Sequence, residues 1–383
     1  MEVYLDNAST TFPKPKEVID SMYNYMLNVG GNANRGNYTN SIQSNRMLLD
    51  ARENICEFFG FDLPSNVIFT NNVTTSLNIL IKGILKKGDH VITSSMEHNS
   101  VLRPILSTKE EKDLNVDIIK CTSEGFLDIE EFNKKINPNT KLVVMTQASN
   151  VTGSVQNLKL IGDICKKNNV FFVVDSSQGA GVIDINMKDI NANAIAFTGH
   201  KSLLGPQGIG GFLIDNELND NCSTLFEGGT GSLSYSLEQP NFLPDKFECG
   251  TLNLPGIIGL SSAISYIKSI GINNIYDHNK ELLSYLLNGL LNIPNLKVYG
   301  DITGKNSSSC VSINVGDLDP SETGYNLECE GIKTRCGLHC SPLAHKTIGT
   351  FPNGTVRLSL SYFTTREEIH YTLYKLNKIA TNI

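Results

Sequence analysis

The sequence lacks the features that mark a membrane protein, a secreted protein or a nucleic-acid-binding protein. No apolar run in the 383 residues approaches the ~18 that a membrane helix needs, and the N-terminus MEVYLDNAST carries no signal-peptide pattern. The net charge is −7 and no basic stripe compensates it, so neither nucleic acid nor an anionic membrane is an expected partner. Nine scattered cysteines favour thiols in a reducing compartment over a disulfide framework. We therefore expect a cytoplasmic protein.

Three common ligand-binding signatures are also missing. No GxGxxG follows the first strand, so a dinucleotide fingerprint is absent. In the segment Gly199-His200-Lys201-Ser202 a His separates Gly from Lys, which breaks the GxxxxGK[ST] spacing of a P-loop. The cluster Cys336, His339, Cys340 and His345 has no second pair at zinc-site spacing, so we expect no metal.

What the sequence does contain is an alternation of short apolar runs with helical patterns. Strands are predicted at 67–70, 90–95, 141–149, 171–177, 194–201 and 208–215, with helices at 76–85 and 158–169. This alternation predicts βαβ units and a mostly parallel central sheet covered on both faces. After about residue 255 come helices at 256–270 and 276–291, three short strands and a last helix at about 365–380. We expect an α/β fold with a large domain, 1–255, and a smaller C-terminal α+β domain, 256–383.

Two residues at predicted strand ends indicate a cofactor. Asp175 closes a buried strand, and Lys201 follows the next one in a Gly-rich setting beside His200. Parallel α/β sheets place their ligand groups at these ends. Pyridoxal 5′-phosphate (PLP) enzymes need a Lys for a Schiff base and a carboxylate for the pyridinium nitrogen. Either residue alone could cap a turn or lie in solvent, but the pair predicts a PLP site.

A phosphate site is predicted between the strand at 67–70 and the helix at 76–85. There the turn Asn72-Val73-Thr74-Thr75 supplies hydroxyls and a helix N-terminus, whose N–H groups and dipole attract anions. Thr74 and Thr75 are therefore candidate phosphate ligands. An ordinary helix cap would use the same residue types, and the two roles are compatible.

Together these segments resemble the class V aminotransferase family of PLP enzymes, and within it the cysteine desulfurases, over nearly the whole chain. The resemblance rests on the motifs YLDNASTT (4–11), taken as the opening strand, MEHNS (96–100), ASNVTG (148–153), VDSSQ (174–178), TGHK (198–201) and FECGT (247–251). It implies the PLP-dependent transferase fold of type I, with the cofactor in the large domain.

The same motifs imply individual roles around the cofactor ring. His98 would stack on the ring and is a candidate for proton transfer. Asn150 would contact the phenolic oxygen, and Asp175 and Gln178 would contact the ring.

The remaining matches concern the phosphate and the Schiff base. Thr198 and His200 would bind the phosphate, and Lys201 would form the Schiff base. Thr251 would reach the phosphate of a partner subunit. That last role implies a homodimer with shared active sites.

Two C-terminal motifs point to the reaction. The segment Arg335-Cys336-Gly337-Leu338-His339-Cys340 resembles the RxGxHC loop of the second group of cysteine desulfurases, in which the Cys receives sulfur. Arg357 matches the Arg that clamps the substrate carboxylate, a task that suits a guanidinium fork. Arg335 and Asn150 are further candidate substrate contacts. The resemblance implies that L-cysteine becomes L-alanine while Cys340 carries a persulfide to an acceptor protein.

Other activities remain open at this level. A selenocysteine lyase or a class V aminotransferase acting on a keto acid would carry the same cofactor motifs. A PLP-binding regulator has no DNA-binding region to support it. The sequence leaves undecided whether His339 or Arg335 favours the Cys340 thiolate, what the extra thiol of Cys336 does, and which protein accepts the sulfur.

Overall fold

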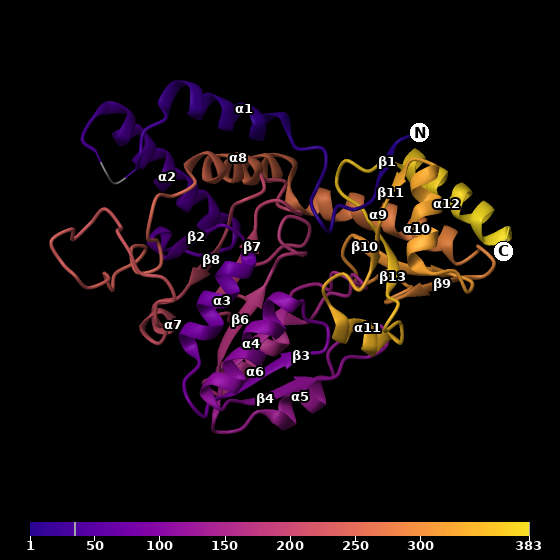
Figure 1. The fold of residues 1–383 in the computed structure, drawn as a ribbon, viewed down its shortest axis with the longest axis horizontal. Coiled ribbons are helices and arrows are strands. Elements are labelled where there is room, and N and C mark those ends of the chain that lie inside the picture. Colours follow the sequence, from indigo (N-terminus) through magenta and orange to yellow (C-terminus); the bar gives the residue numbers. More distant parts are fainter. Residues whose placement is uncertain (34–35, 383) are drawn as a thin grey trace.

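The structure is a computed structural model that describes residues 1–33 and 36–382 (Figure 1). Its centre is a seven-stranded sheet in the order β2-β8-β7-β6-β5-β3-β4. The strands are β2 (Val67–Thr70), β3 (His90–Ser94), β4 (Asn115–Ile119), β5 (Thr140–Thr146), β6 (Phe171–Asp175), β7 (Ala194–Thr198) and β8 (Gly210–Ile214). Strand β8 runs antiparallel to both of its neighbours and the other pairings are parallel. The predicted, mostly parallel sheet is confirmed.

Two apolar cores sandwich this sheet, because successive strand residues point to opposite faces. In β6, Phe172 and Val174 join one core while Phe171 and Val173 join the other. The first core is covered by α2 (Thr39–Phe58), α5 (Ile129–Lys135), α6 (Leu158–Lys167) and α8 (Leu254–Ile270). The second is covered by α3 (Val73–Ile84), α4 (Asn99–Lys112) and α7 (Asn216–Asp220). Burial on both faces explains why the strands read as nearly continuous apolar runs.

A second, smaller sheet lies on the C-terminal side of the molecule (Figure 1). Its order is β12-β13-β10-β9, formed by β9 (Leu296–Tyr299), β10 (Cys310–Val315), β12 (Arg335–Gly337) and β13 (Thr355–Ser359). Around it lie α9 (Ile272–Leu290), α10 (Pro320–Cys329), α11 (Pro342–Ile348) and α12 (Arg366–Thr381). A third apolar core joins this sheet to α9, α10 and α12.

The N-terminal arm crosses to this smaller sheet. Strand β1 (Val3–Tyr4) pairs in parallel with β11 (Ile332–Lys333), and Asp6 bridges to Ser359. The YLDNASTT motif is therefore a strand at its first residue only, and its remaining residues turn across the molecule toward His200 and Arg357. This crossing brings residues from both ends of the chain to one place.

The predicted helices and strands agree with the observed ones to within a few residues, including α8, α9 and α12. Sequence reasoning missed α1 (Lys16–Asn24), α2, α4 and the edge strand β4. In α2 and α4 many Ser, Asn and charged residues weaken the apolar stripe that marks a helix. Strand β4 lies at the sheet edge and buries little of its length.

The division of the chain near residue 255 stays a prediction. Helix α8, just after that point, packs against α1 and α2 of the first part of the chain. None of the helices in the described part of the chain combines the length and apolar composition that crossing a bilayer would need.

Candidate active site

A cavity of about 120 Å³ opens at the carboxyl ends of β5, β6 and β7, where Thr146, Asp175 and Thr198 are the last strand residues. Ligand sites of open α/β sheets lie at this edge. The predicted residues that line the cavity are Thr74, His98, Asn150, Asp175, Gln178, Thr198, His200 and Lys201. Segments between residues 72 and 201 thus converge on one small space.

Lys201 and Asp175 form the electrostatic centre of the cavity. Burial lowers the pKa of Lys201 to about 8; the nearby Asp175 carboxylate opposes this shift, whereas Arg357 and Arg335 add to it. Asp175 is 3% exposed, and its Oδ1 accepts hydrogen bonds from both the backbone N–H and the hydroxyl of Ser177. A Lys that loses its proton near neutral pH is a competent amine nucleophile.

Two buried donors in the same cavity lack partners. Thr198 Oγ1 and His200 Nδ1 are both buried, and neither has a hydrogen-bond partner among the described residues. Burial, followed by the charges of Lys201 and Lys14, lowers the pKa of His200 to about 4, so its ring is neutral at pH 7. Unsatisfied buried polar atoms are costly, and an anion in the cavity would accept from Thr198 Oγ1 and, in the tautomer protonated on Nδ1, from His200.

The N-terminus of α3 completes this anion site. Asn72 caps the helix, its side chain accepting from Thr75 N at 3.0 Å, and Asn72, Val73 and Thr74 line the cavity. Free N–H groups of the first helical turn attract anions. A phosphate beside an amine and a carboxylate is what PLP requires, so these residues fit the cofactor predicted from the sequence.

His98 lines the cavity, and the next residue, Asn99, binds the C-terminal loop. Its Nδ1 accepts a hydrogen bond from Ser100 N at 3.0 Å, which places the proton of the neutral ring on Nε2. Burial lowers the pKa of His98 to about 4, and the charge of Lys201 adds to the effect. At neutral pH the ring can therefore stack on a cofactor and donate from Nε2.

The loop that carries Cys340 is held by the walls of the cavity. Asn150 Nδ2 donates to His339 O at 2.7 Å, Ser341 Oγ donates to Asn150 Oδ1 at 2.8 Å, and Asn99 N donates to Cys340 O at 2.8 Å. His339 and Cys340 both adopt positive φ, 49° and 59°. Such a backbone conformation is strained for residues other than Gly and persists where surrounding contacts enforce it.

The Cys340 thiol is exposed and lies against Arg335. The distance from Arg335 Nη2 to Cys340 Sγ is 3.6 Å. His339 is instead buried, pairs with Thr355 Oγ1 at 3.1 Å, and has a pKa lowered to about 2, mainly by burial and then by Arg357. A neutral, buried His supplies no charge to the thiolate. Of the two candidates that the sequence left open, the geometry favours Arg335.

Arg357 is 1% exposed and held on three sides. Its Nη2 donates to Asp6 Oδ1 and Ser9 Oγ, each at 2.9 Å, and its Nη1 donates to Asn150 O at 3.0 Å. Its Nε is buried and has no partner among the described residues. Arg357 is not among the residues that line the cavity, and Asn150, which does line it, connects the two by accepting from Arg357 Nη1.

Some predicted residues lie outside this arrangement. Thr75 does not line the cavity and instead contacts Asn72. Thr251 is exposed in the segment before α8 and is also absent from the cavity lining of its own chain. Cys336 alternates with Arg335 along β12 and packs into the third core beside α10, facing away from the loop. In the described residues no group of three or more His, Cys, Asp or Glu side chains could hold a metal ion.

Sequence reasoning missed several residues that complete the site. Ser177 fixes Asp175, Ser100 fixes the His98 tautomer, and Asp6 and Ser9 bind Arg357. The signal for the first two was their position within the VDSSQ and MEHNS motifs. Asp6 and Ser9 lie about 350 residues from Arg357 in sequence, so no local pattern could connect them.

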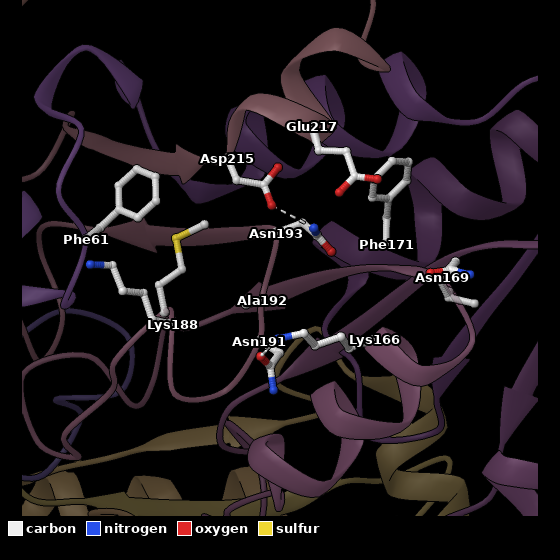
Figure 2. A pocket seen from close by; sticks show the side chains of 12 residues that line it. Phe61, Lys166, Asn169, Phe171, Lys188, Asn191, Ala192, Asn193, Asp215 and Glu217 are labelled. Atoms are coloured by element: carbon white, nitrogen blue, oxygen red, sulfur yellow. Dashed lines mark hydrogen bonds between the residues drawn. The ribbon is translucent and has the colours of Figure 1, made fainter.

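A larger hollow of about 410 Å³ lies at the opposite edge of the sheet (Figure 2). It is lined by residues before β6 and β7 and after β8, including Asn169, Asn193 and Asp215. Its polar groups bind one another: Asn193 donates to Asp215 at 2.7 Å and Lys166 donates to Asn191 at 3.0 Å. This hollow lies at the amino ends of the parallel strands, away from Lys201 and Asp175, and is therefore not the candidate site.

The chain is similar to known proteins over its whole length. The sequence profile of the aminotransferase class-V family matches residues 3–372. The chain is 34% identical to a probable cysteine desulfurase of Methanothermobacter thermautotrophicus, over 99% of this chain and 94% of that protein. It is 32% identical to one of Pyrococcus abyssi, over 100% and 95%. The apo structure of a cysteine desulfurase from Thermococcus onnurineus NA1 superposes with a TM-score of 0.95 at 32% identity, covering 100% of this chain and 95% of that one. The predicted fold class is confirmed.

Proposed function

Because the chain belongs to the class-V aminotransferase family, as its motifs predict, we propose that it is a PLP-dependent cysteine desulfurase. It converts L-cysteine to L-alanine and leaves the sulfur on Cys340 as a persulfide. The observation that carries this proposal is the placement of Cys340. Its exposed thiol lies 3.6 Å from Arg335 Nη2, on a loop that Asn150 and Asn99 hold against the cavity.

Different cavity residues would bind different parts of the cofactor. Lys201 would bind its aldehyde carbon, Asp175 its ring nitrogen, and Thr198, His200 and the N-terminus of α3 its phosphate. His98 and Gln178 would contact the ring. When bound, PLP takes up the electron pair released at the substrate Cα, which makes the substrate C–S bond cleavable. Lys201, whose pKa burial lowers to about 8, would carry the Cα proton.

Arg357 would orient the substrate. Its buried, unpartnered Nε and its fixed position allow it to hold the carboxylate of L-cysteine. Asn150 couples this site to the sulfur-accepting loop, because its carbonyl oxygen binds Arg357 while its side chain binds His339 O. A carboxylate held by Arg357 would lie close to Asn150, which lines the cavity with Lys201 and also binds the Cys340 loop.

Sulfur transfer then requires a thiolate at Cys340. The Cys340 sulfur attacks the substrate sulfur, and an S–S bond forms as the substrate C–S bond breaks. The electron pair of that bond remains with the carbon, which is protonated to give alanine. The positive charge of Arg335 stabilises the attacking thiolate. One L-cysteine and one thiol thus give one L-alanine and one persulfide.

The cofactor assignment is tested by the colour of the purified protein. Wild type should be yellow, and Lys201→Ala should be colourless after the same purification. An unchanged visible spectrum in Lys201→Ala would remove Lys201 from its role.

The persulfide assignment is tested with a matched pair of thiol variants. Cys340→Ser should keep the cofactor but release no sulfide from L-cysteine. Cys336→Ser, whose side chain faces the third core, should retain activity. Full activity of Cys340→Ser with L-cysteine would defeat the persulfide step. Parallel assays with selenocysteine, and with L-cysteine plus a keto acid, distinguish the lyase and aminotransferase alternatives.

We further propose that the enzyme is a cytoplasmic homodimer that passes sulfur to an acceptor protein. Exposed apolar side chains lie on α1, on the short π-helix η1 (Tyr25–Val29), on α2 and in the segment 221–253. The ribbon of that segment extends beyond α2 (Figure 1). They include Leu27 on η1 and Leu237, which is 105% exposed, on the segment. Thr251 lies in that same segment, so dimerisation would bring it to the partner's site. All nine cysteines are free thiols, which fits a reducing compartment.

The dimer is tested by charge insertion. The double variant Leu27→Asp and Leu237→Asp should sediment as a monomer and bind PLP more weakly. Leu291→Asp, at a residue 50% exposed on the C-terminal side, is the matched control and should leave the dimer intact. A double variant that still sediments as the wild type does would refute this interface.

A further inference from the structure

Ser9 lies between the two arginines of the candidate site. Its Oγ accepts hydrogen bonds from Arg357 Nη2 at 2.9 Å and from Arg335 Nη1 at 3.2 Å. The same hydroxyl donates its proton to Asp6 Oδ1 at 2.7 Å. A hydroxyl has one donor and two acceptor positions, so all three positions of Ser9 are used. The N-terminal arm therefore binds both guanidinium groups through one atom.

The two guanidinium groups would otherwise repel each other. Arg335 on β12 and Arg357 on β13 are directly opposite partners in an antiparallel pair. Like charges at such positions destabilise a sheet. Arg357 is neutralised by its ion pair with Asp6 at 2.9 Å. Arg335 has no carboxylate within ion-pair distance among the described residues, and its contacts are Ser9 Oγ and Cys340 Sγ.

The position of Arg335 beside Cys340 thus depends on Ser9. Arg335 is half-buried, and a long side chain with one fixed anchor turns toward water when the anchor is lost. Arg357 is different, because its bonds to Asp6 and to Asn150 O keep it in place without Ser9. Loss of the Ser9 hydroxyl should therefore move Arg335 and leave Arg357 largely fixed.

We propose that Ser9 is a positioning residue that holds the Arg335 guanidinium against the Cys340 thiol. Its hydroxyl bridges Arg335 to the fixed Arg357–Asp6 pair, so the N-terminal arm sets the charge that the sulfur nucleophile experiences. The proposal rests on the proposed function for its catalytic meaning, because Cys340 is there the sulfur acceptor. The geometric claim about Ser9, Arg335 and Cys340 is independent of that function.

The test is the pH dependence of Cys340 alkylation in the full-length protein. Iodoacetamide reacts with thiolate, and mass spectrometry of the Cys340 peptide gives its rate at each pH. In Ser9→Ala the Cys340 rate near pH 7.5 should fall about threefold, as expected for loss of one partly exposed charge contact to the thiolate. Ser9→Thr, which keeps the hydroxyl, should restore the wild-type curve.

Three controls separate positioning from general loosening. Cys329, also exposed, is an internal reference whose rate should not change. Ser359→Ala removes a hydroxyl that anchors Ala8 N at 2.9 Å but contacts neither Arg, so its Cys340 curve should match the wild type. In an Arg335→Gln background, Ser9→Ala should add no further change, since the two act through one contact.

An unchanged Cys340 curve in Ser9→Ala would overturn the proposal, as would an equal fall in rate in Ser359→Ala or an additive fall in the Arg335→Gln background. Sulfide release from L-cysteine is measured separately on the wild type. If the wild type releases none, the proposed function fails, whereas the alkylation curves still decide the role of Ser9.

Discussion

Lys201 gives the sharpest stability prediction, because its burial makes a charged amine costly in the folded protein without cofactor. Burial lowers its pKa from 10.5 to about 8. Between these two values the unfolded chain binds more protons than the native protein, so the native state becomes more stable as pH rises. The charged Lys201 amine therefore lowers the free energy of unfolding by its full amount below about pH 8 and by nothing above about pH 10.5.

The magnitude follows from the same two values. At about 1.36 kcal/mol per pKa unit, the free energy of unfolding is reduced by about 3 kcal/mol at pH 7, about 2 at pH 9 and under about 1 at pH 10. Lys201→Met removes the titrating amine and leaves an unbranched apolar side chain that is one atom shorter. The variant without cofactor should therefore be more stable than wild type without cofactor by these amounts.

The assay is urea unfolding of both proteins without cofactor, at one protein concentration and at pH 7, 9 and 10. Cofactor must be absent from both samples, since a bound ligand would stabilise the wild type by mass action. The difference between the midpoints should shrink as pH rises. A difference independent of pH, or a variant less stable than wild type at pH 7, would refute the reasoning. The rate at which wild type recombines with added PLP should also reach half its maximum near pH 8.

Three further outcomes are expected. Burial raises the pKa of Glu97 to about 8, so the native protein loses stability as pH rises from 4.5 to 8. Over that window the stability of Glu97→Gln relative to wild type should increase, by up to about 4 kcal/mol in urea unfolding. A difference that stays constant with pH would contradict this. Arg357→Lys should raise the KM for L-cysteine at least about tenfold, because a Lys ammonium cannot reproduce the two-pronged guanidinium that binds Asp6 and Asn150 O. An unchanged KM would remove Arg357 from the substrate site. A Cβ at Gly324 would lie 2.2 Å from Cys336 Sγ, so Gly324→Ala should lower the melting temperature at a cost of about 1–3 kcal/mol, and adding Cys336→Ala should restore it.

Much of the fold could be predicted because the large sheet is buried on both faces. Buried strands such as β6 carry unbroken apolar runs, and their carboxyl ends carry the polar residues of the site, so strand and site were visible together in short motifs. Helices α2 and α4 escaped prediction because their polar surfaces dilute the apolar stripe. The local apolar pattern predicts an element well where the element is fully buried, and poorly where it is only partly buried.

The site itself was predicted in part. Lys201, Asp175, His98 and His200 were identified from neighbours in the sequence, and the structure brings them to one cavity. Thr251 lies apart from the cavity of its own chain, and its proposed role needs a second copy.

The sequence by itself determined which chemical groups the protein carries at its strand ends: an amine, a carboxylate, a phosphate cradle and a reactive thiol. The tertiary structure decided the pKa values of those groups and the directions in which their side chains point. Burial lowered the pKa values of Lys201 and His339, and strand alternation turned Cys336 toward the core and Arg335 toward Cys340. Pairing of the first strand with the C-terminal part brought Ser9 between two arginines more than 300 residues away. Desolvation and long-range pairing depend on the whole fold, and therefore no short motif could contain them.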